Sequence, residues 1–540
     1  MSRKSIWAVA FLGVAFASLV ADAPPLQAQG PRFQITFARS ARAEPVTGRV
    51  FVVISRTAET EPRLQVRNTG VPFFGRDVEN LGPEEPVLID ASVLGYPVAD
   101  LREVPAGSYF VQAFVNVYSE FKRADGHVLW MHDDQWEGQN WRISPGNLYS
   151  LPQKVWLDAS QGYTIELNAD QVIPPVVVPP DDEWVQRFRF QSPTLSRFWG
   201  RPVYLGATVL LPRDYATSTM SYPVLYNQGH FSLRNPLGFE PGNALYGEWV
   251  GDDFPRVIVV TFQHPNPYYD DSYAVNSVNV GPYGDAIMEE LIPEVERRYR
   301  VIGQPWARLL DGGSTGGWEA LALQILHPDS FGGTWSYCPD PVTFSEYEQI
   351  NLYEDENALY KQYEWRREPI PQQRETDGKI RLTWQQRAWY ERVAGTHGRS
   401  GEQNDIWSAV FGPVGEDGYV RPVFDNLTGV IDKDVVEYWK RYDLLFHLRD
   451  NWSTLGPKLE GKLHVYTGDM DTYALNNAVV LLERWMKTTT DPHYEGHFLY
   501  GDRKPHCWRG EGTYGDRIRE MAGFMLRRRP DGVTTPWWQY

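Results

Sequence analysis

The stretch "DGGSTGGWEA", residues 311–320, decides how the fold of this chain is interpreted. It places glycines, one serine and one threonine between the apolar run "ARLL" and the apolar run "WEALALQIL". The first run predicts a strand, and the spacing in the second predicts a helix. Gly312, Ser314 and Gly316 therefore form the pattern Gly-x-Ser-x-Gly at a strand-to-helix junction, which predicts a nucleophile elbow.

A serine at such a junction must adopt a strained backbone conformation to project its hydroxyl, so its neighbours need to be small. The N–H of Thr315 begins the predicted helix, where unpaired donors and the helix dipole favour a developing oxyanion. The pattern by itself is weak, because glycine and serine are common in flexible loops, and that is the alternative for Ser314. The strand before it and the amphipathic helix after it favour the nucleophile.

A serine hydroxyl becomes an effective nucleophile only when a base takes its proton and an acid orients that base. With an elbow of this kind, the acid follows a later strand and the histidine follows the last one. Asp469 and Asp471 follow the predicted strand "KLHVYT", and His506 follows the predicted strand "HFLYG". We predict His506 as the base and Asp471 as the acid, with Asp469 as the alternative acid.

A second oxyanion donor is expected in the loop after the predicted strand "YPVLYNQ". Gly229 stands there before His230 and Phe231, so the backbone N–H of His230 or Phe231 is the candidate. Alternatively, His230 only lines the substrate cleft. His493 and His497 have a zinc-like spacing but no third ligand pattern, so we expect no metal site and no cofactor.

The chain divides into regions of different pattern. Residues 29–170 contain short strands separated by turns, which predicts an all-β sandwich of immunoglobulin-like size. Residues 171–182 contain four prolines and predict a stiff linker. Residues 183–540 alternate strands with helices, including one helix that Pro293 should kink or divide, and this predicts an α/β fold with a mostly parallel sheet. A polar, aromatic stretch at about residues 339–445 is expected to be a cap-like insertion over the site.

The beginning of the chain has the features of an export signal. Arg3 and Lys4 precede an apolar stretch from Ile6 to Val20, followed by small residues and prolines, which predicts a signal peptide over residues 1–28. The expected location is therefore secreted or periplasmic. No later segment is long and apolar enough to span a bilayer. The formal net charge of -17 opposes binding to nucleic acid or to an anionic membrane.

Several stretches, in this order, resemble the putative esterase family of the α/β-hydrolase fold, which includes enterochelin esterases, S-formylglutathione hydrolases, feruloyl and acetylxylan esterases, and mycolyltransferases. The stretches are "YPVLYNQGH", "GDAIMEELIPEVERRYRV", "RLLDGGSTGGWEALALQILHPDSFGG", "YTGDMD" and "PHCW". The resemblance spans roughly residues 185–338 and 455–510, and it implies a triad of Ser314, Asp471 and His506. The family commonly has His-Gly in its oxyanion loop, whereas this chain has the order Gly-His.

The only two cysteines, Cys338 and Cys507, lie 169 positions apart. Cys338 ends the predicted strand after the elbow helix, and Cys507 directly follows the predicted base. Both are therefore expected near the carboxyl edge of the sheet, where a disulfide would tie the histidine loop to the strands. Two buried free thiols are the alternative.

These observations predict a secreted serine esterase that cleaves a carboxylic ester through an acyl-enzyme intermediate. Its expected substrate is a small-molecule or carbohydrate-linked ester. One alternative is a serine peptidase of prolyl-oligopeptidase type, although the roughly 140 residues before the linker are too few for a propeller. The other is a non-catalytic carbohydrate-binding protein on a hydrolase scaffold, which the many tryptophans and tyrosines would suit.

Overall fold

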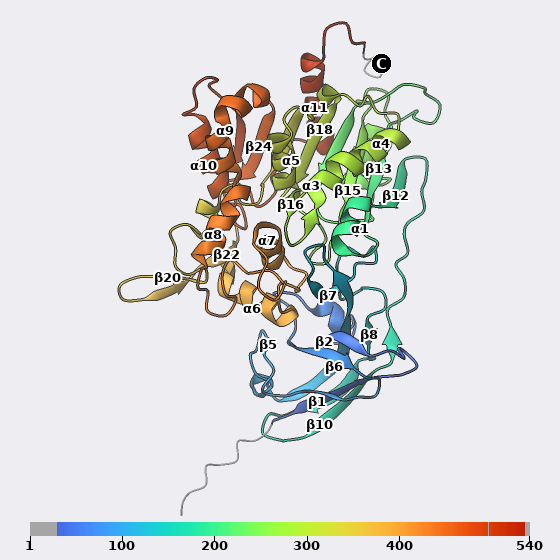
Figure 1. Ribbon diagram of the computed structural model, residues 1–540, viewed down its shortest axis with the longest axis vertical. Helices are drawn as coiled ribbons and strands as arrows, with labels where there is room; N and C mark the ends of the chain where they lie inside the picture. The colour runs from blue at the N-terminus through green and yellow to red at the C-terminus, as the bar shows by residue number, and fades with distance from the viewer. Residues whose placement is uncertain (1–29, 495, 535–540) are drawn as a thin grey trace, which may run out of the picture.

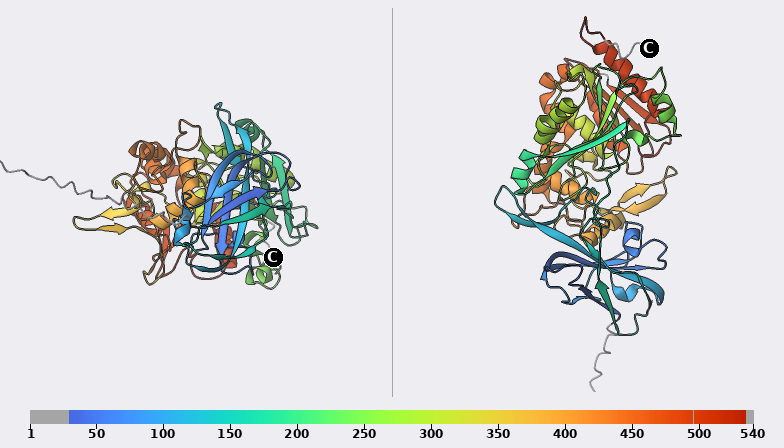
Figure 2. Two further views of the ribbon diagram at one scale, coloured as in Figure 1. Left: turned by 90° about the horizontal axis from the view of Figure 1, so that it is seen from below. Right: turned by 90° about the vertical axis from the view of Figure 1, so that its right-hand side faces the viewer.

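The computed structural model describes residues 30–494 and 496–534. The predicted signal peptide lies outside these residues. The first strands of the described chain form one end of an elongated molecule, and the α/β region forms the other (Figures 1 and 2). Within the described residues, no helix combines the length and the apolar character needed to cross a membrane.

Residues 30–192 contain strands and two short 3-10 helices but no α-helix. One sheet has the strand order β10-β1-β4, and the other has the order β11-β8-β6-β2-β3-β5, with β7 and β9 paired to β6. The strands are β1 (Arg32–Phe37), β2 (Val46–Ser55), β3 (Phe73–Leu81), β4 (Val87–Ile89), β5 (Gly95–Tyr96), β6 (Gly107–Lys122), β7 (Val128–His132), β8 (Leu148–Tyr149), β9 (Gln153–Leu157), β10 (Thr164–Ala169) and β11 (Gln171–Val172). The immunoglobulin-like classification of this region stays a prediction.

Strand β11 occupies the first two residues of the segment predicted as a linker. Gln171 and Val172 pair with β8, because the prolines that prevent further pairing begin only at Pro174. The predicted boundary between the two regions is therefore two residues early.

The two sheets share one hydrophobic cluster. Strand β1 contributes Phe33, Ile35 and Phe37 to it, and β2 contributes Val50 and Val52. These positions alternate along each strand, as expected when one face of a strand is buried. The intervening residues of β2 point to the opposite face of the larger sheet.

The opposite face of the larger sheet packs against helix α6 (Trp384–Ala394) of the insertion. Phe51 of β2 and Phe73 of β3 belong to the same cluster as Tyr390 and Val393 of α6. Arg49 adds a polar connection, because its guanidinium donates to the carbonyl oxygen of Val393 at 2.8 and 3.0 Å. The N-terminal sheet thus supports the insertion directly.

The α/β region contains one eight-stranded sheet with the order β12-β13-β15-β14-β18-β19-β24-β25. Strands β14, β15, β18, β19, β24 and β25 are parallel, and β13 is antiparallel to both of its neighbours. The sheet strands are β12 (Val185–Gln191), β13 (Tyr204–Leu210), β14 (Val224–Gln228), β15 (Ile258–Gln263), β18 (Arg308–Gly313), β19 (Gly333–Tyr337), β24 (Leu463–Gly468) and β25 (His497–Gly501). The α-helices outside the insertion are α1 (Pro193–Trp199), α2 (Ala244–Trp249), α3 (Tyr283–Ala286), α4 (Ile292–Arg298), α5 (Thr315–Leu326), α9 (Leu444–Leu459), α10 (Asn476–Met486) and α11 (Tyr514–Arg528).

The helix that Pro293 was expected to kink or divide changes its hydrogen-bonding pattern just before that proline. A π-helical turn, Ile287–Leu291, separates α3 from α4, and Pro293 is the second residue of α4. Proline has no N–H to donate to the preceding turn, and the wider π turn accommodates this loss. The chain stays helical through this turn, so the kink or division expected at Pro293 stays a prediction.

The insertion lies between the α/β sheet and the N-terminal sheets (Figure 1). It contains strands β20 (Tyr360–Gln362), β21 (Arg367–Pro369), β22 (Pro371–Arg374) and β23 (Ile380–Thr383), and helices α6, α7 (Gln403–Phe411) and α8 (Lys433–Trp439). A short pair, β16 (Asn276–Ser277) and β17 (Gly281–Pro282), precedes α3. This position lets the insertion supply side chains to any site at the carboxyl edge of the sheet.

We expect Arg49→Ala to lower the free energy of unfolding by about 3 kcal/mol, because it removes a buried guanidinium that donates to the carbonyl groups of Gly75 and Val393 and to the Asp77 carboxylate. Arg67→Ala, a change at an exposed arginine of the same region, should cost less than about 0.5 kcal/mol. Urea titrations of both variants measure the difference. If the two variants were equally stable, the hydrogen bonds from Arg49 to α6 would contribute nothing to the free energy of unfolding.

Candidate active site

Ser314 lies at the junction of β18 and α5 with φ 59° and ψ -123°. A non-glycine residue with positive φ is strained, and the packing around it explains why the strain persists. A Cβ added to Gly316 would lie 2.1 Å from the carbonyl oxygen of Gln228, and one added to Gly312 would lie 2.3 Å from that of Gly316. Only glycine fits at either position, so helix and strand approach each other closely enough to hold the turn.

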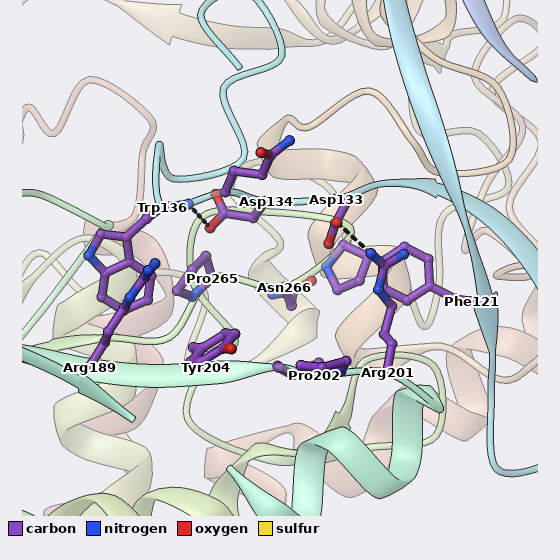
Figure 3. Close-up of a pocket in the computed structure, with 13 residues that line it drawn as sticks. Phe121, Asp133, Asp134, Trp136, Arg189, Arg201, Pro202, Tyr204, Pro265 and Asn266 are labelled. Carbon is purple, nitrogen blue, oxygen red and sulfur yellow. Dashed lines mark hydrogen bonds and ion pairs between the residues drawn. The ribbon is translucent and has the colours of Figure 1, made fainter. Parts of the chain in front are cut away.

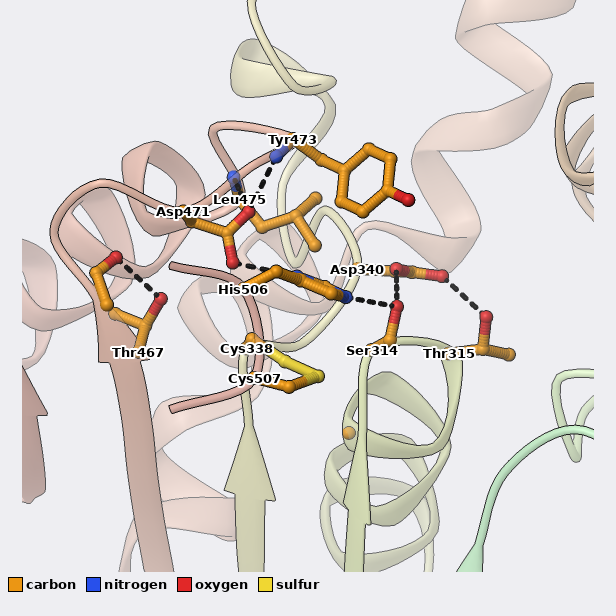
Figure 4. The surroundings of a disulfide bond; sticks show 12 residues. Ser314, Thr315, Cys338, Asp340, Thr467, Asp471, Tyr473, Leu475, His506 and Cys507 are labelled. Carbon is orange, nitrogen blue, oxygen red and sulfur yellow. Dashed lines mark hydrogen bonds and ion pairs between the residues drawn. A yellow bond between two sulfur atoms is a disulfide. The ribbon is translucent and has the colours of Figure 1, made fainter. Parts of the chain in front are cut away.

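The structure brings the predicted triad residues together from three strand ends (Figure 4). His506 Nε2 lies 3.0 Å from Ser314 Oγ, and His506 Nδ1 lies 2.8 Å from Asp471 Oδ2. Asp471 follows β24 and is fully buried, and its other oxygen accepts from the N–H of Tyr473 at 2.9 Å. With Nδ1 donating to the carboxylate, Nε2 is left to accept the serine proton.

Asp469, the alternative acid, is bonded to a different group from His506. Its carboxylate accepts from the backbone N–H of Arg503 at 2.6 Å, and among the described residues it has no hydrogen bond to His506. Of the two carboxylates after β24, the structure therefore brings only Asp471 to the imidazole.

Cys338 and Cys507 form a disulfide, which confirms that prediction. Cys338 follows β19, and Cys507 is adjacent to His506 (Figure 4). The bond ties the loop after β25 to the sheet next to the elbow, where a Cβ added to Gly313 would lie 3.1 Å from Cys507 Sγ. It restricts where His506 can lie relative to Ser314.

The predicted oxyanion residues have different surroundings. Thr315 is the first residue of α5, so its N–H has no intrahelical acceptor. His230 Nδ1 lies 3.0 Å from both Asp270 Oδ1 and Asp271 Oδ2, and the ring of Phe231 packs edge-on against another aromatic ring, that of Trp136, at 5.2 Å. The backbone donor roles of these residues stay predictions.

The side chain of His230 is an ion-pair partner as well as a cleft residue. Burial acts to lower the pKa of His230, but the carboxylates of Asp270 and Asp271 outweigh it and raise the pKa well above its usual range. The two carboxylates therefore favour the charged form of the imidazole.

Ser314 and His506 open into a cavity of about 380 Å³. Most of its lining is polar, and three aromatic rings complete it. The lining residues are His230, Tyr269, Ser314, Asp340, Glu348, Gln372, Arg387, Glu402, Gln403, Trp407, Tyr473, Leu475 and His506. Residues from the insertion therefore form much of the wall.

A second cavity, of about 370 Å³, lies where the loop after β7 meets β12 and β13 (Figure 3). Arg201 pairs with Asp133 at 2.6 Å on one side of it, and Arg189 lies over the ring of Trp136 on the other. Its lining contains no serine, cysteine or histidine. The cavity at Ser314 is therefore the candidate active site.

Sequence reasoning missed Asp340. Its Oδ1 lies 3.4 Å from Ser314 Oγ, and its Oδ2 accepts from Thr315 Oγ1 at 3.0 Å and from the Tyr273 hydroxyl at 2.6 Å. Burial raises the pKa of Asp340, although these hydrogen bonds oppose the rise. Asp340 follows Cys338 by two positions, so the reasoning that placed the cysteine at the sheet edge could have placed this carboxyl there too.

Residues 204–408 match the family model described as "Putative esterase". The matched segment runs from β13 to α7 and includes Ser314 and Asp340, which confirms the family resemblance for this part of the chain. It ends before Asp471 and His506. No protein of curated function matches the chain significantly.

Among solved structures, a ferulic acid esterase has 17% sequence identity to this chain and a TM-score of 0.39. The similarity covers 64% of this chain and 97% of the esterase chain. An S-formylglutathione hydrolase from Agrobacterium tumefaciens is similar at 13% identity, with a TM-score of 0.35 over 64% of this chain and 95% of its own. A feruloyl esterase module from Clostridium thermocellum, complexed with sinapinate, has 12% identity and a TM-score of 0.32 over 66% of this chain and 94% of its own.

We expect Gly316→Ala to lower the free energy of unfolding by about 3 kcal/mol or more, because the new methyl group would overlap backbone atoms of β14. Gly247→Ala is the matched control, since that Cβ would meet no atom within 4 Å, and it should gain about 0.5 kcal/mol of helix propensity. Urea titration of both variants is the measurement. If the Gly316→Ala protein were as stable as the control, α5 and β14 would not approach each other as closely as the structure shows.

Removal of the disulfide in a Cys338→Ala/Cys507→Ala variant should cost about 2–5 kcal/mol, because the bond closes a long loop in the unfolded chain. Unfolding with and without reductant checks this. The wild-type protein should become less stable under reductant, and the double variant should not respond. If the wild-type protein were equally stable with and without reductant, the stabilising role of the Cys338–Cys507 disulfide would be contradicted.

Proposed function

We propose that this esterase-type serine hydrolase cleaves carboxylic esters through an acyl-enzyme intermediate formed on Ser314. The single observation that carries the proposal is the continuous chain of hydrogen bonds from Ser314 through His506 to Asp471. Each atom along it has a suitable role: an alcohol, a base and an ionisable acid. The esterase-family match around Ser314 supports the same reaction class.

In the proposed first step, His506 Nε2 removes the proton of Ser314 Oγ while the oxygen attacks the ester carbonyl. The tetrahedral intermediate collapses when His506 gives that proton to the leaving alcohol. Water then enters and attacks the acyl carbon while His506 takes one of its protons. His506 returns that proton to Ser314 Oγ as the bond between this oxygen and the acyl carbon breaks, and the carboxylic acid leaves. Atoms and charge balance without a further reactant.

Asp471 has a supporting role in this scheme. Its fully buried carboxylate holds the imidazole in the tautomer with Nδ1 protonated and stabilises the imidazolium formed during each step. The carboxylate keeps two backbone donors as well, from Tyr473 and Leu475, so its own position is fixed.

The N–H of Thr315 and a backbone N–H of the loop at His230 and Phe231 are proposed to bind the oxyanion. The close approach of Gly316 to Gln228 supports this, because it sets the loop after β14 against the start of α5. A donor from each segment can then face one oxygen above Ser314.

Several finer features belong to the same proposal. The sandwich-like N-terminal region braces the insertion through α6, and the insertion selects the substrate, a small-molecule or carbohydrate-linked ester. The predicted signal peptide would direct the chain to the periplasm or the exterior, where the disulfide would be stable. The complete hydrogen-bond chain supports turnover over binding alone.

Comparison of two neighbouring carboxylates tests the proposed triad. Ser314→Ala should abolish hydrolysis of an activated ester such as 4-nitrophenyl acetate, and Asp471→Asn should lower kcat by about 10³- to 10⁴-fold, because the imidazole loses its orienting charge. Asp469→Asn should change kcat by less than about twofold, since this carboxylate does not contact His506.

Steady-state rates of the three purified variants are the measurement, with folding checked by circular dichroism. If Asp469→Asn were the damaging change and Asp471→Asn the mild one, the assignment of the acid would be reversed. If Ser314→Ala kept the wild-type rate, the proposed function would be wrong.

A further inference from the structure

The loop after β14 has backbone N–H groups that are free to bind a ligand. Among the described residues, the N–H groups of His230 and Phe231 donate no hydrogen bond, whereas the N–H of Ser232 donates to Gln263 Oε1 at 2.9 Å. Free donors beside the start of α5 are what an oxyanion requires. Their usefulness depends on how firmly this part of the loop is held.

The α/β region holds the loop on both sides of Phe231. Before it, the imidazole of His230 is bound by the two aspartates described above, and after it the carbonyl oxygen of Ser232 accepts from Gln263 Nε2 at 2.9 Å. The ring of Phe231 itself is half-buried and belongs to none of the hydrophobic clusters of the described residues. Its support comes from another part of the chain.

Two residues of the loop after β7, in the N-terminal region, contact the ring of Phe231. The rings of Trp136 and Phe231 meet edge-on, with centroids 5.2 Å apart and an interplanar angle of 84°. A Cβ added to Gly138 would lie 2.6 Å from Phe231 Cδ1. The indole of Trp136 also lies against β13, because a Cβ added to Gly206 would lie 2.8 Å from Trp136 Cη2. The N-terminal region therefore packs directly on the loop that is expected to bind the oxyanion.

The backbone around Trp136 is strained and tightly bonded. The φ angles of Trp136, Gly138 and Gln139 are 78°, 74° and 56°, in the left-handed region that is unfavourable for tryptophan and glutamine. The Asp134 carboxylate accepts from the N–H groups of Trp136 at 2.9 Å and Gln139 at 2.6 Å (Figure 3). The side chain of Gln139 donates to the carbonyl oxygen of Pro267, which follows β15. These bonds fix the indole relative to the α/β region.

We propose that Trp136 is a positioning residue for the oxyanion hole. Its indole holds the ring of Phe231, so that the N–H of Phe231 faces the oxygen of the tetrahedral intermediate together with the N–H of Thr315. The inference rests on the proposed ester hydrolysis and gives the N-terminal region a part in it. Trp136 does not line the cavity at Ser314 and acts only through Phe231.

The oxyanion exists only while the ester is being cleaved, so a misplaced donor affects the reaction rather than the binding of substrate. We expect Trp136→Ala to lower kcat for 4-nitrophenyl acetate by about 10²-fold, as a shift of about 1 Å can, with KM changed less than about threefold. Trp136→Phe keeps an aromatic edge against Phe231 and should restore most of the rate. Trp156→Ala, at a tryptophan of β9 that is 62% exposed, should change kcat less than about twofold.

Two further measurements separate positioning from a general loss of structure. Phenylboronic acid bonds to a serine oxygen as a tetrahedral anion, so its inhibition constant should weaken in parallel with kcat in Trp136→Ala protein that circular dichroism shows to be folded. Phe231→Ala removes the ring but keeps the backbone N–H, and it should reproduce the loss. The double variant should be no slower than the slower single variant, since both changes remove one contact.

An unchanged kcat in Phe231→Ala would overturn the proposal, and this result does not depend on whether Trp136→Ala folds. Losses that multiply in the double variant, or that appear only in KM, would overturn it as well. Wild-type protein that hydrolyses the ester while the variants match it would refute the role of Trp136 and leave the proposed function standing. Wild-type protein that hydrolyses no ester would refute both.

Discussion

The rest of the site depends on the contact between helix α5 and strand β14. The backbone of Gly316 lies so close to the carbonyl group of Gln228 that no side-chain carbon fits between them. This contact keeps Ser314 in its strained conformation and sets the loop after β14 beside the start of α5. The position of the nucleophile and the expected position of the oxyanion donors therefore follow from one steric constraint.

The geometry around this contact is completed by segments that are distant in sequence. The disulfide fixes the histidine loop to the strand end beside the elbow. The N-terminal sheet packs on α6 and, through Arg49, holds its carboxyl end. Helix α6 in turn carries Arg387 into the cavity wall. The β-rich region thus contacts the insertion, and none of its described residues lines that cavity.

The sequence was sufficient for features that depend on local pattern. The glycines around Ser314, the strand before it and the order of Asp471 and His506 predicted the elbow and the hydrogen-bonded chain. It did not predict Glu348 or Gln372, because a carboxyl or amide within the insertion has no periodicity that reveals where it packs. Asp340 was missed although its position two residues after Cys338 indicated the edge of the sheet. It also placed the linker two residues early, since pairing of β11 depends on β8, a strand distant in sequence.

The central claim is that Ser314 is the reactive group of a serine hydrolase. Labelling of the intact, folded protein with a fluorophosphonate probe, followed by peptide mapping in a mass spectrometer, tests it most directly. The geometry predicts a single adduct, on the peptide that contains Ser314, and none after heat denaturation, because reactivity depends on His506. No adduct on the folded protein, or an adduct on another serine, would contradict the account.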